Sequence, residues 1–151
     1  MNRVEVSVEG VPPPEWTDAL KRFASKVLTL LGKHNWDLSL LLCDNTAIRS
    51  LNARFRDRDE ATDVLSFELG ESFSGEGEER YLPGDIAISL ETLRENAAFF
   101  AVPEDEELRR LVVHGILHLD GRDHSTNDQN EAMLQIQEKI LRELSGEHIL
   151  T

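Results

Sequence analysis

The sequence of 151 residues predicts an α+β fold: a single mixed sheet of about four strands packed with about five helices. Strand-like and helix-like segments follow one another in the order β-α-β-α-β-β-α-α-α, so strands gather early and helices late. Hydrophobic residues make up 40% of the chain and charged residues 30%, which is typical of a globular domain. The length suits one domain, which we expect to span 1–151.

The first half of the chain alternates between strands and helices. Three valines within 4–8 alternate with polar residues, as in a half-buried strand. A run of prolines then precedes 15–31, where apolar residues recur at helical spacing. A second strand is predicted over 36–43, and Asp44 or Asn45 caps the short helix after it.

The middle of the chain predicts two more strands and a loop. Residues 64–69 form a third strand, and Ile86 to Ile88 are the core of a fourth. Between them, 68–79 is rich in Gly, Ser and Glu and holds no Lys or Arg, which predicts a mobile loop. Ser89 then caps a helix that runs to about residue 100.

The last third is helical. Pro103 opens a helix that runs to about residue 119, with four acidic residues at its positive end, and Gly121 ends it. A final helix is predicted over about 127–144.

Composition excludes several function classes. Sixteen Lys and Arg against 29 Asp and Glu give a net charge of −13, which argues against nonspecific nucleic-acid binding and against an anionic membrane surface. The single cysteine, Cys43, excludes an intrachain disulfide and a cysteine-rich zinc site. With no apolar run long enough to be a signal core or a membrane span, the expected location is the cytoplasm.

Three of the five histidines fall within eleven residues, as His114, His118 and His124. The first two are spaced i, i+4 and share one face of the predicted helix. A left-handed turn at Gly121 could bring the third back toward them. Three imidazoles of this kind form a facial site for one Zn²⁺ per chain, or for Ni²⁺ or another divalent metal, with a position open for water or substrate.

The same histidine spacing occurs in metzincin proteases. Those enzymes need a glutamate directly after the first histidine as general base, and here that residue is Gly115. A metzincin-like metal hydrolase is therefore an alternative that lacks its base.

Four arginines cluster at 49, 54, 56 and 58, ahead of a polar turn and the third strand. Cations near a helix C-terminus favour the helix dipole and can simply be solvated. Arginine is also the side chain suited to a fork of hydrogen bonds to phosphate. Both interpretations remain open on spacing alone.

Three motifs together carry a specific resemblance. They are H-G-x-L-H-L-x-G-x-D-H over 114–124, N-x-x-F/Y-R-x-x-D-x-x-T-D-V-L-S-F over 52–67, and P-G-D-I-A-I-S over 83–89. In this order, over nearly the whole chain, they resemble the bacterial YbeY family of endoribonucleases and rRNA maturation factors. The resemblance implies a zinc-type metal on His114, His118 and His124, and an Arg56 that faces the substrate and stabilises its phosphate.

The resemblance also implies a substrate and partners. The substrate would be single-stranded RNA, the 16S rRNA precursor, in 3′-end maturation and ribosome quality control. Small-subunit ribosomal proteins and an Era-type GTPase would be partners, with no DNA and no membrane. A ribosome-assembly factor without enzymatic activity, whose metal organises a binding surface, is a further alternative. A small cationic cleft on an acidic body predicts weak, salt-sensitive binding to free RNA.

Two positions depart from the family pattern, and the proton carrier is not named by it. Asp120 and Arg122 stand where the family commonly has an apolar and an aromatic residue. Arg122 could add a phosphate contact, but an ion pair with Asp120 or Asp123 is the simpler interpretation. Asp63, Asp85 and Asp123 are candidate carboxylates for proton transfer or for orienting a ligand histidine. Water and the RNA 2′-hydroxyl both remain candidate nucleophiles.

Overall fold

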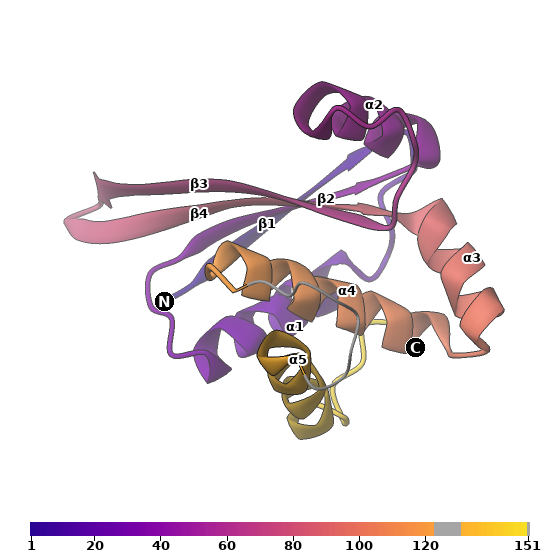
Figure 1. Ribbon diagram of the computed structural model, residues 1–151. Coiled ribbons are helices and arrows are strands. Elements are labelled where there is room, and N and C mark those ends of the chain that lie inside the picture. Colours follow the sequence, from indigo (N-terminus) through magenta and orange to yellow (C-terminus); the bar gives the residue numbers. More distant parts are fainter. Residues whose placement is uncertain (123–130, 151) are drawn as a thin grey trace.

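In residues 1–122 and 131–150, four strands form one mixed sheet in the order β1-β2-β4-β3 (Figure 1). Strands β1, β2 and β4 run parallel, and β3 runs antiparallel to β4. The computed structural model describes residues 1–122 and 131–150. In it the strands are β1 (Arg3–Glu9), β2 (Asp37–Cys43), β3 (Val64–Gly75) and β4 (Glu78–Ser89).

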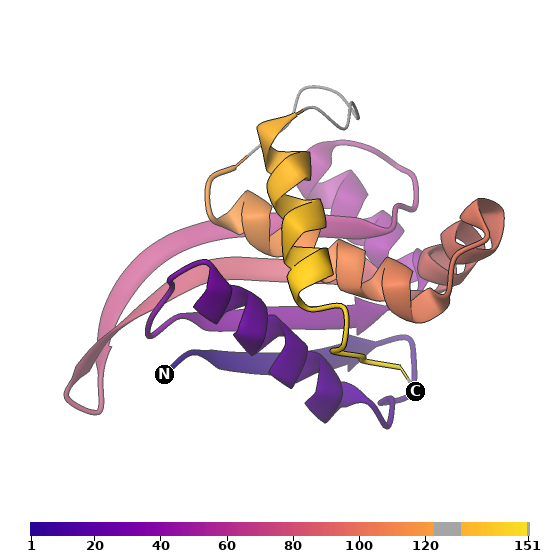
Figure 2. The same cartoon turned by 90° about the horizontal axis from the view of Figure 1, so that it is seen from below.

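Within the described residues five helices pack around this sheet, and the predicted α+β class and element order are confirmed. They are α1 (Thr17–Leu30), α2 (Asn45–Arg56), α3 (Leu90–Phe100), α4 (Glu104–Leu119) and α5 (Ala132–Glu143). Helices α1, α4 and α5 lie on one side of the sheet and α2 on the other, while α3 stands at its end (Figures 1 and 2). Residues 127–130 of the predicted last helix lie outside the described residues.

The two faces of the sheet build two cores of unequal size. In β2, successive side chains alternate, so Leu38, Leu40 and Leu42 join the large core with α1 and α4. Cys43 points the other way, into a small core beneath α2 that includes Ile48. Helix α2 lies over one end of that face of the sheet (Figure 1).

The predicted mobile loop over 68–79 is wrong. Strands β3 and β4 continue through it as a two-stranded ribbon that projects beyond the helices (Figure 2). A buried arginine near the turn of the ribbon ties it to the start of β2 and to the N-terminus: Arg80 donates to the Asp37 carboxylate at 2.6 and 2.9 Å and to the Met1 carbonyl at 2.8 Å. These anchors come from distant parts of the chain, which is why local composition did not reveal them.

Helix α4 lies close against β4 because residue 115 has no side chain. A Cβ at Gly115 would stand 2.9 Å from two side-chain carbons of Ile86, closer than packed carbons come. This approach places the histidine-bearing face of α4 beside β3.

Candidate metal centre and its cleft

His114 and His118 stand one turn apart on α4, as their spacing predicts. Their Nε2 atoms are 3.1 Å apart, so the two rings converge on a common point. Both side chains are half-buried at the surface between α4 and β3. The third predicted ligand, His124, lies outside the described residues.

A chain of polar contacts orients His114. Its Nδ1 lies 2.7 Å from Oε1 of the buried Gln137 on α5. The Gln137 amide nitrogen donates to Glu138, which in turn accepts two hydrogen bonds from Arg110 at 2.9 and 3.2 Å. Because the amide is turned this way, its oxygen faces the imidazole and accepts from Nδ1–H. The Nε2 lone pair of neutral His114 is then directed at His118.

The series of contacts behind His114 ends in an ion pair between Arg110 and Glu138, and each partner stabilises the charge of the other. The hydrogen bond from Arg110 lowers the pKa of the Glu138 carboxyl, although its partial burial acts in the opposite direction. The same bond raises the pKa of Arg110. Both groups remain charged near neutral pH, so the acceptor for the Gln137 amide is maintained.

The geometry of the histidine pair suits a divalent metal of the zinc type. Two imidazole nitrogens on a tetrahedral ion at about 2.0–2.1 Å would be roughly 3.3 Å apart. The separation here is 3.1 Å. The part of the chain that the structure describes contains no cluster of three His, Cys, Asp or Glu side chains suited to a metal, so a third protein ligand would come from elsewhere.

An open cleft of about 700 Å³ lies in front of the two histidines. Strand β3 forms one wall, and the end of α4 forms the other. At Gly121 (φ +80°) the chain turns out of α4, as predicted. Arg122 at the rim donates to Asp120 at 3.2 Å, which confirms the predicted ion pair. The lining residues are Arg56, Val64, Leu65, Ser66, Glu68, His114, His118, Gly121 and Arg122.

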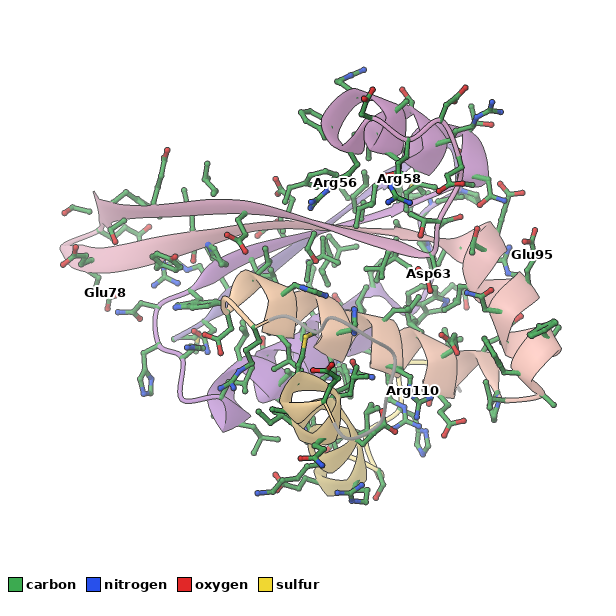
Figure 3. The ribbon with its side chains drawn as sticks, in the orientation of Figure 1. Arg56, Arg58, Asp63, Glu78, Glu95 and Arg110 are labelled. Atoms are coloured by element: carbon green, nitrogen blue, oxygen red, sulfur yellow. The ribbon has the colours of Figure 1, made fainter. Side chains whose placement is uncertain are left out.

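Arg56 reaches this cleft from the opposite side of the sheet. It is the last residue of α2, and its guanidinium passes the edge strand β3 and donates to the Ser66 carbonyl (Figure 3). In the described residues its charge is not paired with a carboxylate. By contrast, Arg49 pairs with Asp59 and Arg58 with Glu60. Of the four clustered arginines, two pair with carboxylates, Arg54 lies over the Phe55 ring, and Arg56 is the one that lines the cleft.

The candidate carboxylates that the structure describes do not line this cleft. Asp63 accepts from Val64 N and from Asn96, which ties the start of β3 to α3, and it is not among the described residues that line the cleft. Asp85 lies on the α2 side of the sheet, and Asp123 is outside the described residues. The carboxylate that lines the cleft is Glu68, which sequence reasoning missed. Its position two residues after Ser66 on a strand was the available signal.

Comparisons with known proteins bear on this arrangement. A family model described as endoribonuclease YbeY matches residues 6–145. The chain belongs to the YbeY family. A YbeY endoribonuclease of Treponema denticola is 47% identical over 150 residues, covering 98% of this chain and 97% of that one. Its counterpart in Borrelia turicatae is 48% identical over 136 residues, 89% of this chain and 90% of the relative.

A solved structure agrees with the YbeY fold found here. A solution structure of a protein from Thermotoga maritima is 30% identical, with a TM-score of 0.65 over 95% of this chain and 90% of that chain. Among the described residues, no helix is long and apolar enough to cross a membrane.

Proposed function

We propose that this protein is a metal-dependent endoribonuclease that cuts single-stranded RNA, acting in the cytoplasm on the 16S rRNA precursor in 3′-end maturation and ribosome quality control. Membership of a family whose curated members are named endoribonucleases supports the reaction class. The observation that carries the proposal is the convergence of His114, His118 and an unneutralised Arg56 on one open cleft. Small-subunit ribosomal proteins and an Era-type GTPase are the partners we propose.

Each cleft residue has a distinct part in this proposal. His114 and His118, together with His124, would hold Zn²⁺ or another divalent metal, with Gln137 fixing the tautomer of His114. Such a metal supplies Lewis-acid polarisation of a phosphate oxygen and activation of water. Arg56 would bind the phosphate and stabilise the charge that develops on it. Glu68 is the carboxylate positioned to accept or give a proton.

The structure makes the metzincin-like alternative less favourable. A glutamate in place of Gly115 would point into Ile86 rather than into the cleft. A peptidase of that type would therefore lack both its general base and the space to hold one.

Replacing Arg56 tests the proposed phosphate contact. Because Arg56→Ala removes the cleft cation, we expect cleavage of single-stranded rRNA to fall about 100-fold or more, with folding and metal content unchanged. Arg58→Ala is the matched control, since Arg58 is already paired with Glu60. Cleavage by Arg56→Ala at the rate of the control would remove Arg56 from the mechanism.

Replacing His118 tests the metal centre independently of activity. We expect His118→Ala, purified without added metal, to contain far less metal per chain than the wild-type protein by elemental analysis. His148→Ala is the control, because His148 lies at the other end of the fold beside Asp105. An unchanged metal-to-protein ratio would overturn the histidine site. A folded His118→Ala protein that still supports rRNA maturation would favour the non-enzymatic assembly role.

A further inference from the structure

A second hollow lies on the α2 side of the sheet, opposite the histidines. This hollow, which we call the α2 groove, measures about 630 Å³. Helix α2 packs over Cys43 and Ala87, with Leu41, Leu65 and Phe67 partly buried beside them, and the groove lies along this packing. The groove is lined by Ser7, Ser39, Leu40, Leu41, Leu51, Phe55, Arg56, Phe67, Glu68, Leu69, Asp85 and Ala87.

The floor of the α2 groove is a cross-strand row of mixed chemistry. Strand register places Ser39 beside Asp85 and Asp85 beside Phe67, across three neighbouring strands. The row offers a hydroxyl, a carboxylate and an aromatic ring in sequence. Asp85 is exposed, and no hydrogen bond or ion pair joins its carboxylate to another residue within 1–122 or 131–150.

One wall of the α2 groove is aromatic. Phe55 projects from α2 with 58% of its surface exposed and meets Phe67 edge-on, with ring centroids 5.3 Å apart. Leu69 is 51% exposed on the same side. The Arg54 guanidinium lies over the Phe55 ring at 5.7 Å. An exposed aromatic ring with a cation beside it is the usual platform on which proteins stack single-stranded bases.

The α2 groove is continuous with the metal cleft. Arg56 and Glu68 line both hollows, and only the edge strand β3 separates them. An RNA strand bound at the histidines needs to pass only around the edge of β3 to reach Phe55.

We propose that the α2 groove binds the base of a nucleotide adjacent to the cleaved linkage, stacked on Phe55 while its phosphate is held by Arg56. This rests on the proposed function. The carboxylates of Asp85 and Glu68 repel a phosphate, so the occupant presents its base and not its backbone. Asp85 accepts N–H donors, so it can hydrogen-bond the amino group of a base or the ring N–H of guanine or uracil. The groove thereby selects single strands, because a paired base cannot leave its helix to enter it.

A cycle of substitutions in protein and substrate tests this inference. Cleavage of a short single-stranded RNA is compared with cleavage of a series in which one position at a time is abasic. The enzymes are the metal-loaded wild type, Phe55→Ala and Phe99→Ala. Phe99 is the matched control, because it is 82% exposed and lies at the end of α3, outside both hollows.

The expected result is a loss of additivity at a single position. Removing the base next to the cleaved linkage should lower the wild-type kcat/KM about tenfold, the lower range for loss of one stacked base. Phe55→Ala should lower cleavage of the intact RNA by a similar factor, yet have no further effect on that abasic RNA. The proposal would be overturned if the losses in kcat/KM from the abasic position and from Phe55→Ala multiplied. It would also be overturned if Phe55→Ala cleaved the intact RNA as well as Phe99→Ala does.

A binding measurement separates this inference from the cleavage reaction itself. Metal-free protein is titrated with the same RNA carrying 2-aminopurine at each position in turn. Fluorescence quenching at one position that is lost in Phe55→Ala supports the groove even if the loaded enzyme cuts no RNA, an outcome that would overturn only the proposed function. No quenching at any position, or a Phe55→Ala defect seen only in binding to ribosomal proteins, would show that the groove does not hold a base.

Discussion

Gln137 determines which nitrogen of His114 is available as a ligand. Its amide oxygen accepts from Nδ1–H, so Nε2 is left with its lone pair. A histidine whose far nitrogen is held in this way loses little freedom when it binds a metal. At the scale of single residues, the site therefore depends on a side chain that never reaches the cleft.

Gln137→Ala should weaken metal binding without removing a ligand. We expect the affinity to fall about 10- to 100-fold, the usual effect of losing the hydrogen bond behind a ligand histidine. The measurement is competition with a calibrated chelator. Gln135→Ala, at an exposed position on the same helix, is the control. Equal affinity of Gln137→Ala and the control would contradict this positioning role.

Sequence reasoning could find only part of this site. The pairing of His114 and His118 follows from helical spacing, and their Nε2 atoms do converge. Gln137 was missed because it stands within the buried apolar stripe of α5, where the only signal was one polar residue four positions from Met133 and from Leu141. Its partner is 23 positions away along the chain, a distance that no periodicity relates.

At the scale of the elements, the cleft depends on how closely α4 lies on β4. Gly115→Ala adds one methyl group against Ile86, which is fully buried and cannot move away freely. We expect a net loss of about 1–2 kcal/mol in the free energy of unfolding, since overlap in a packed core outweighs the gain in helix propensity. Urea denaturation measures it.

Gly146→Ala is the control for this substitution. No atom lies within 4 Å of a Cβ built at that position, so we expect its unfolding free energy to stay within about 0.5 kcal/mol of wild type. If Gly115→Ala were as stable as this control, close packing would not explain the glycine.

Element types were predictable where local pattern and burial agree. The alternating leucines of β2 and the Asp44 cap of α2 are both found in the structure. The ribbon of β3 and β4 was not predictable in this way, because its β3 side chains are mostly exposed and a buried position near its turn holds the charged Arg80. Its order comes from Arg80, whose partners Asp37 and Met1 are 43 and 79 positions away.

For the whole molecule, the position of the acidic residues matters as much as the net charge of −13. The β3–β4 ribbon alone carries carboxylates at 68, 71, 76, 78 and 79. Arg56 and a bound divalent metal would supply positive charge only within the cleft. A long RNA would meet repulsion over most of this surface, while a short single-stranded segment could enter.

This distribution predicts weak, salt-sensitive binding to free RNA, with a salt slope limited to that of a few phosphate contacts. We expect a dissociation constant in or above the micromolar range at physiological salt, and a slope of log K against log salt between about −1 and −2, as for one to three phosphate contacts. Fluorescence anisotropy over a salt series measures both. Nanomolar binding to arbitrary RNA, or a slope steeper than about −4, would contradict a cleft confined to a few phosphates.

The hydrogen bond from Arg56 to the Ser66 carbonyl has a consequence for solubility. Strand β3 is at the edge of the sheet, and edge strands can pair with those of other molecules and start aggregation. A guanidinium on one of its carbonyls, next to an acidic ribbon, blocks that pairing. Arg56, which we assign to phosphate binding, thus also hinders self-association through β3 while no RNA is bound.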